Sequence, residues 1–183
     1  MKQKNAWWVM MQGVVISFLG LVLSSCGSQQ GTVVQKGTIQ SDTTWANQVI
    51  VKGDVEVAKG VTLTVTPGTV VKFANIEPVG PANLYDTKED YFDTAELIVS
   101  GRLIAKGTKD KMIRFTSAER SPRPGDWGAI NFQDSTGNVL EYCDISFSDT
   151  GVHGHGVQVT VEHCSLHENG VGFGYKNVPR YRT

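Results

Sequence analysis

The chain has 183 residues, and its 17 basic and 18 acidic side chains give a net charge of −1 at neutral pH. This balance excludes a global electrostatic basis for binding nucleic acid or an anionic membrane surface. The 20 glycines and 6 prolines indicate many tight turns rather than disorder, and the length suits one domain with a real core.

The first 25 residues have the pattern of an export signal. Two lysines precede a largely apolar run, residues 6–23, and small residues follow it, which is typical of a secretory signal peptide. The sequence Leu23-Ser24-Ser25-Cys26 resembles the lipobox of bacterial lipoproteins. The resemblance implies that a peptidase recognises Leu23, Ser24 and Ser25, cleaves before Cys26, and leaves this cysteine acylated.

Two alternatives explain the same segment: an ordinary secretory signal with a chance cysteine, or an uncleaved membrane anchor. An uncleaved anchor needs about 20 apolar residues, and polar Gln12 and Ser17 interrupt this run. Gly27, not aspartate, follows Cys26, which in the sorting pattern of Gram-negative lipoproteins implies passage to the outer membrane. We therefore expect the mature protein to be held by lipid at the bacterial outer membrane, outside the cytoplasm.

Residues 26–44 are polar and rich in glycine, serine, threonine and glutamine, and this composition predicts a flexible linker after the lipidated cysteine. From residue 45 onward, short β-branched runs alternate apolar with polar residues and end at glycines. That alternation predicts β-strands, and signals for helices are almost absent.

Self-similarity predicts how these strands are arranged. Residues 140–146 resemble residues 161–167 at an offset of 21, and residues 51–60 resemble residues 99–107. A 21-residue unit of short strands and turns predicts one coil of a parallel β-helix, in which coils stack about 4.8 Å apart. Inward positions must then be apolar; in the last coil these are Val159, Val161, Cys164, Leu166, Val171 and Phe173. Glycines are expected at the corners, at Gly53, Gly60, Gly101, Gly107, Gly151 and Gly170.

A family resemblance follows from five segments taken together. They are Gly53–Val57, Leu63–Phe73, Gly101–Gly107, Ile113–Ser117 and Gly125–Phe132. The series resembles bacterial surface and secreted proteins with right-handed parallel β-helix repeats. The resemblance implies an all-β domain, a short right-handed β-solenoid, over residues 45–183, with an acidic and aromatic insertion at 74–95. It implies no single activity, because such proteins include adhesins, polysaccharide-active enzymes and lipoproteins.

Two cysteines and three carboxylates are predicted to gather where adjacent coils meet. Cys143 and Cys164 occupy the same position of consecutive units, either as a disulfide, which export permits, or as stacked thiols. Parallel neighbours orient their Cβ atoms poorly for a disulfide, which favours free thiols. Glu141 and Glu162 are also in register, and with Asp144 nearby they form either a Ca²⁺ patch or, as their usual exposure favours, solvated carboxylates.

The histidines and the insertion supply the remaining candidates. His163 and His167 lie about 13 Å apart on a strand, and His153-Gly154-His155 lacks an assured third ligand, so we expect no metal and no cofactor. Tyr85, Tyr91 and Phe92 in the insertion suit stacking on sugars or contact with a protein. The alternative is that they pack back over the coils.

No catalytic motif is recognisable in the chain. The sequence therefore favours a lipid-anchored β-helix that acts as a surface scaffold or a binding or adhesion module, with a glycan or surface protein as partner and no nucleic acid. The alternative is a carbohydrate-active enzyme, lyase-like or hydrolase-like, or a fragment of one. A groove lined by arginine, aspartate and aromatic residues would favour that alternative.

Overall fold

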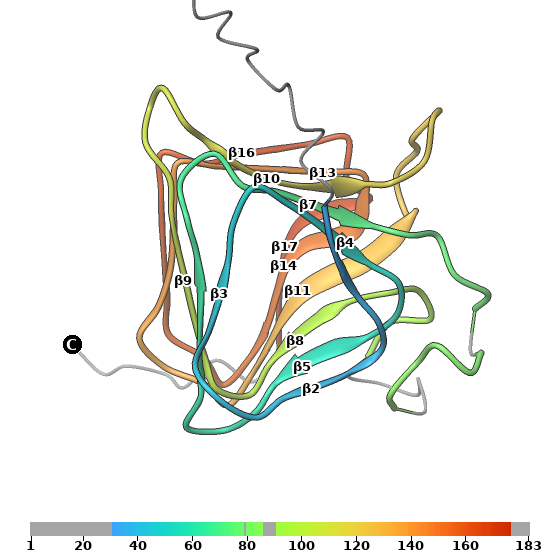
Figure 1. Ribbon diagram of the computed structural model, residues 1–183, viewed down its shortest axis with the longest axis horizontal. Helices are drawn as coiled ribbons and strands as arrows, with labels where there is room; N and C mark the ends of the chain where they lie inside the picture. Colours follow the sequence, from blue (N-terminus) through green and yellow to red (C-terminus); the bar gives the residue numbers. More distant parts are fainter. Residues whose placement is uncertain (1–30, 79, 86–90, 177–183) are drawn as a thin grey trace, which may run out of the picture.

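The computed structural model describes residues 31–78, 80–85 and 91–176. These residues form stacked coils of a parallel β-helix, each built from short strands in three sheets (Figure 1). The described residues form strands and turns only, and none of them belongs to a helix suited to crossing a membrane. The predicted all-β solenoid is confirmed. The predicted signal peptide, residues 1–25, and Cys26 lie outside the described residues.

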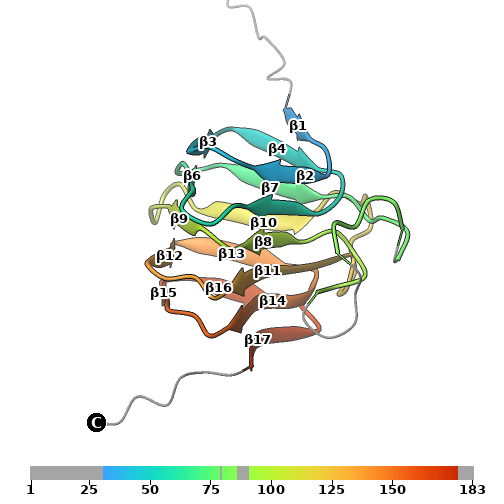
Figure 2. The ribbon, with the colours of Figure 1, turned by 90° about the horizontal axis from the view of Figure 1, so that it is seen from below.

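The three sheets are parallel throughout, and successive strands of the chain enter sheets A, B and C in turn (Figure 2). Sheet A contains β1 (Thr32–Val34), β4 (Gln48–Val51), β7 (Val70–Phe73), β10 (Ile113–Ser117), β13 (Cys143–Ser146) and β16 (Ser165–His167). Sheet B contains β2 (Gly37–Ile39), β5 (Val55–Val57), β8 (Leu97–Val99), β11 (Trp127–Gln133), β14 (Ser148–His155) and β17 (Val171–Lys176). Sheet C contains β3 (Thr43–Trp45), β6 (Thr62–Val65), β9 (Arg102–Lys106), β12 (Asn138–Glu141) and β15 (Val159–Glu162).

The core is a set of columns in which apolar residues of successive coils lie over one another. One column of sheet B consists of Val55, Leu97, Ile130 and Val152, all fully buried. Trp127 stacks on Phe73 with ring centroids 4.2 Å apart, and its indole N–H donates to the carbonyl of Ser146. Because each buried aliphatic side chain contributes roughly 1.5–3 kcal/mol, the columns hold the coils together.

The last coil, formed by β15, β16 and β17, does not bury the positions predicted for its core. Phe173 continues the column of Val152, yet Phe173 is 45% exposed and Val171 is 49% exposed. Val159, Val161, Cys164 and Leu166 are only partly buried. The prediction of full burial is wrong here because a coil of a solenoid is covered by its two neighbours, and in the described part this coil has one.

The β-helix also begins earlier than the sequence predicts. Residues 32–45, mostly assigned to a flexible linker, form β1, β2 and β3, which pair with β4, β5 and β6. The prediction of a linker is therefore wrong for residues 31–44, while residues 26–30 lie outside the described part. A short strand needs few apolar residues, and Val34 and Ile39 alone pack this coil against the core before Trp45.

The corners of the later coils are turned by single residues with left-handed backbone conformation. Tyr142 and His163 have φ of 48° and 54° and hold equivalent corners, since they are 21 residues apart. Phe147 and Glu168 form a second such pair. Among the glycines predicted at corners, only Gly60 has a positive φ. Short loops without glycine thus turn the chain wherever the side chain can point outward.

The two predicted internal repeats have different outcomes. Residues 140–146 and 161–167 are in register, with Glu141 opposite Glu162. The match of residues 51–60 to 99–107 is not a structural equivalence, because Val99 lies opposite Val57 and not opposite Val51. In both segments a strand ends just before a turn that contains glycine. This shared local pattern produces the sequence similarity.

Candidate functional site

The insertion between β7 and β8 returns along the outer face of sheet B. It is the green segment beside β5 and β8 in Figure 1. Asp54 anchors it, because the backbone N–H of Leu84 donates to Asp54 Oδ2 at 2.6 Å and the N–H of Asp54 donates to the carbonyl of Ala82 at 2.9 Å. Gly53 permits this approach, since a Cβ there would lie 2.7 Å from the same carbonyl.

Phe92 anchors the second half of the insertion. Its N–H donates to Glu96 Oε1 at 3.2 Å, and its ring meets the His153 ring edge to face, with centroids 5.3 Å apart. The ring lies over Gly128, where an added Cβ would be 2.6 Å from the Cβ of Phe92. Ile98, which lies between Glu56 and Asn131 across the sheet, is fully buried.

A buried polar network lies beneath the insertion. The Asn131 side-chain amide donates to Glu96 Oε2 at 2.8 Å, and its oxygen lies 3.2 Å from Nδ1 of His153. Burial raises the pKa of Glu96 well above its ordinary value, and the neighbouring Asp54 raises it further. Burial also raises the pKa of Asp54. Because both carboxyl groups are covered, they hold the insertion and are not accessible to a substrate.

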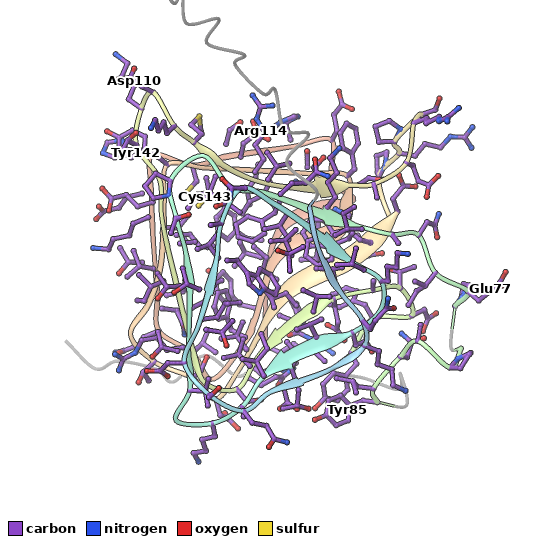
Figure 3. The ribbon with its side chains drawn as sticks, in the orientation of Figure 1. Glu77, Tyr85, Asp110, Arg114, Tyr142 and Cys143 are labelled. Carbon is purple, nitrogen blue, oxygen red and sulfur yellow. The ribbon has the colours of Figure 1, made fainter. Side chains whose placement is uncertain are left out.

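The accessible part of this face is a row of three side chains joined by hydrogen bonds. Tyr85 stacks on Tyr91 with ring centroids 4.5 Å apart, and the Tyr85 hydroxyl donates to Glu56 Oε2 at 2.7 Å. Ser100 donates to the other oxygen, Oε1, at 2.8 Å. The bond to Glu56 raises the pKa of Tyr85 to about 12. Figure 3 shows Tyr85, which belongs to the insertion, on the outer side of sheet B. We call Tyr85, Glu56 and Ser100, together with the Tyr91 ring that stacks on Tyr85, the tyrosine–glutamate row.

A polar groove of about 300 Å³ continues from this row to the corner between sheets B and C. Ser100 belongs to both, and Lys59, Arg102 and Asp134 bring charged groups to the groove. Gly101 forms part of the wall and leaves no space for a side chain, because a Cβ would lie 2.3 Å from the carbonyls of Ala58 and Val61. Aromatic, carboxylate and cationic groups therefore follow one another along one surface.

Comparison with known families assigns the fold to a family. Residues 37–139, more than half of the chain, match the pectate-lyase-like β-helix domain. The chain belongs to this family. No curated protein and no solved structure matches it. The match spans the strands from β2 to β12 and includes the insertion, so the tyrosine–glutamate row and the groove both lie inside the pectate-lyase-like domain.

The predicted contact residues of the insertion divide into two groups. Tyr85 is 38% exposed and stacks on Tyr91, which is half-buried. Phe92 instead packs against His153 and covers Gly128. The insertion of this pectate-lyase-like domain thus packs over the coils and also presents aromatic rings. The predicted lipidation site, Cys26 with Leu23, Ser24 and Ser25, lies outside the described residues.

The three carboxylates proposed as a Ca²⁺ alternative do not form a metal site. Glu141 and Glu162 are in register as predicted, but Glu141 Oε2 faces Lys106 Nζ at 3.9 Å. Asp144 Oδ1 lies 3.3 Å from His167 Nε2. Across the described ranges, no group of three acidic, histidine or cysteine side chains is placed to hold a metal ion. Glu141 thus faces Lys106 and Asp144 faces His167, so these two carboxylates have separate partners.

Cys143 and Cys164 lie in adjacent coils, as their spacing predicts, and both are free thiols. The backbone N–H of Cys143 donates to Cys164 Sγ at 3.4 Å. In Figure 3, Cys143 points into the coil while Tyr142 points outward. The stacked-thiol alternative therefore describes the structure.

The sequence did not identify the buried network of Asp54, Glu96 and Asn131. One signal was present: Asp54 and Glu96 each come directly before a strand of sheet B, and the opposition of Val55 and Leu97 places the two acids side by side. The 22 residues between Phe73 and Glu96 hide this register in the sequence. His153 and His155, expected in a turn, lie in β14 and are nearly buried.

Proposed function

We propose that this pectate-lyase-like protein is a lipid-anchored, extracytoplasmic module that binds an acidic polysaccharide across the tyrosine–glutamate row and the adjoining groove. The observation that carries the proposal is the continuity of this surface. A stacked aromatic pair, in which Tyr85 is exposed and Tyr91 is half-buried, leads through Glu56 and Ser100 to a groove that holds Lys59 and Arg102.

Each part of the surface suits one feature of a sugar chain. The exposed ring of Tyr85, which stacks on the half-buried Tyr91, offers an apolar face against which a pyranose can stack, as aromatic side chains do at binding surfaces. Glu56 accepts hydrogen bonds and can receive them from sugar hydroxyls. Lys59 and Arg102 favour a carboxylate on the sugar, and the planar guanidinium can bind it with two hydrogen bonds.

Burial of the two carboxyl groups that lie side by side on this face, those of Asp54 and Glu96, supports binding over hydrolysis. Hydrolysis of a glycosidic bond by the usual route needs two carboxyl groups on opposite sides of that bond. Asp54 and Glu96 are the paired acids of this face, and both are buried beneath the insertion. Substrate therefore meets a surface of hydrogen-bonding and stacking groups, which is what a binding module requires.

The lipid anchor is supported by the resemblance of Leu23–Cys26 to a lipobox. Anchoring leaves the surface of sheet B facing the periplasm or the cell exterior, where polysaccharides occur. Metabolic labelling of cells with an alkyne fatty acid tests this part of the proposal. We expect label on the wild-type protein and none on Cys26→Ala, and equal labelling of both would contradict the anchor.

The binding proposal is tested by retention of the detergent-solubilised full chain on immobilised polygalacturonate, compared with immobilised neutral cellulose. We expect retention on polygalacturonate, and Tyr85→Ala should weaken it about fivefold, since stacking of a sugar on one aromatic ring is worth of order 1 kcal/mol. Tyr175→Ala is the matched control, because Tyr175 is 46% exposed in the last coil, away from the row. Equal loss in both variants, or no retention of the wild type, would contradict the proposal.

The role of the groove is tested separately. We expect Arg102→Gln to weaken retention on polygalacturonate and to leave the thermal midpoint near that of the wild type. Arg120→Gln removes an exposed arginine from the β10–β11 connection and serves as the control. If both variants lose the same affinity, nonspecific charge attraction explains the retention and the groove does not.

A second candidate function is a carbohydrate-active enzyme of the lyase type. The observation that favours it is the groove itself, where Arg102 and Lys59 lie with Asp134, because a lyase needs a basic residue to remove a proton. Aromatic residues are not among those lining the groove. Incubation with polygalacturonate and Ca²⁺ distinguishes the two candidates: an ultraviolet absorbance increase from unsaturated products, lost in Arg102→Gln, would establish the enzyme.

A further inference from the structure

The stacked cysteines form a close pair at one corner of the last two coils. Asp144 lies opposite Ser165, so the preceding residues, Cys143 and Cys164, are direct neighbours across the sheet. The N–H of Cys143 points at Cys164 Sγ, 3.4 Å away. Neighbouring parallel strands are about 4.8 Å apart, which lies within the Cα separations that disulfides span.

The two thiols differ in how accessible they are. Cys143 is fully buried, and its thiol donates to the carbonyls of Ala105 and Glu141 at 3.5 Å. Cys164 is only partly buried, because it lies in the last described coil. Reagent from solution therefore meets Cys164 before Cys143.

The two thiols also ionise in this order, Cys164 before Cys143. Hydrogen bonding from Cys143 lowers the pKa of Cys164 to about 7, although burial and the nearby Glu141 oppose this. The hydrogen bond to Cys164 raises the pKa of Cys143, and burial and the charge of Asp144 raise it further. The first proton therefore leaves Cys164, and the buried thiol stabilises the resulting thiolate.

We propose that Cys143 and Cys164 form a thiol–disulfide exchange site, in which Cys164 is the attacking residue and Cys143 the resolving residue. The inference rests on the adjacency of the two cysteines, on the hydrogen bond from the backbone N–H of Cys143 to Cys164 Sγ and on the unequal exposure of the two thiols. The co-reactant is a disulfide, either a small molecule or a partner protein.

The exchange proceeds in two balanced steps. The Cys164 thiolate attacks one sulfur of the disulfide RSSR, forms Cys164–S–S–R and releases RS⁻, which takes up a proton. The Cys143 thiol then loses its proton to solvent and attacks Cys164 Sγ, releasing the second RS⁻. Overall, two protein thiols are oxidised to one disulfide and RSSR is reduced to two RSH.

The bond formed would be reversible. In-register parallel neighbours hold their Cβ atoms farther apart than the mean of about 3.8 Å in disulfides, and such strain makes a disulfide easier to reduce. Both cysteines directly follow corner residues, Tyr142 and His163, and not the middle of a strand. The corner can adjust its backbone, so the bond can close without displacing the coils.

The first test follows the full chain during reaction with oxidised glutathione. Digestion after glutamate separates the cysteines, since Glu141, Glu162 and Glu168 place Cys143 and Cys164 in different peptides and Cys26 in a third. Mass spectrometry should show a transient glutathione adduct on the Cys164 peptide, followed by a disulfide that links it to the Cys143 peptide. Absence of both species while unfolded protein reacts would overturn the proposal.

Two variants and an alkylation assay complete the test. Cys143→Ser should accumulate the glutathione adduct on Cys164, and Cys164→Ser should leave Cys143 reacting at least tenfold more slowly. In the wild-type protein, iodoacetamide should alkylate Cys164 with a midpoint near pH 7 and should alkylate Cys143 only after unfolding. This measurement uses no variant, so it tests the proposal even if a variant does not fold. Equal rates for the two cysteines in the folded protein would contradict the assigned order.

Discussion

The middle coils and the last coil differ in burial although their sequences follow the same pattern. Val152 is fully buried, while Phe173, the next residue in the same column, is 45% exposed. The difference does not come from the residues, since phenylalanine is the larger apolar side chain. It comes from the number of neighbouring coils, because the coils on both sides of a solenoid residue supply most of its cover.

The largest expected effect tests this difference directly. Phe132→Ala in β11 should lower the free energy of unfolding by about 3–5 kcal/mol, because the ring is fully buried. Phe173→Ala removes the same atoms from the last coil and should cost under about 1 kcal/mol. Urea unfolding of both variants measures the difference. Equal losses would mean that the last coil is as well covered as the middle ones.

Glycines provide a second, smaller test of the same difference. Gly128→Ala places a methyl group 2.6 Å from Phe92 Cβ and should cost about 1–3 kcal/mol, since the insertion must move. Gly172→Ala in β17 meets nothing within 4 Å and should change stability by less than about 0.5 kcal/mol. Thermal unfolding of the two variants decides it, and a neutral Gly128→Ala would mean that Phe92 does not pack there.

The smallest expected effect is a change of stability with pH. It arises from the buried carboxyl groups of the middle coils. Asp54 and Glu96 have a raised pKa in the folded protein, so the stability they give is complete at pH values below their unfolded pKa, about 4. It is lost as pH rises through the folded pKa. The thermal midpoint should therefore fall from pH 4 toward neutrality, and less steeply in Glu96→Gln. Glu119→Gln, which removes an exposed carboxylate, is the control; identical slopes in all three proteins would contradict the assignment.

The architecture could be predicted from the sequence because the 21-residue offset and the alternation of apolar residues are local patterns. Leu140 and Val161 lie opposite each other as predicted. The first coil could not be predicted, because β1, β2 and β3 have three residues each and only one apolar residue in each needs to be buried. Such strands have the composition of a linker.

The candidate site was predicted only in part. Tyr85 and Tyr91 were identified because aromatic residues in a polar insertion are conspicuous in the sequence. Glu56 and Ser100 were missed, since 43 residues separate them and only the pairing of β5 with β8 brings them together. Long-range register, set by where the chain leaves and rejoins the stack, determines these contacts.

The insertion leaves sheet A after β7 and rejoins sheet B at β8 within one coil, and the register of β5, β8 and β11 continues across it. The length of this segment is thus uncoupled from the rise of the stack. Its composition and size can change without moving any core column, and coils can be added at an end without moving the insertion. The length of the solenoid and the binding surface on its side can therefore change independently of each other.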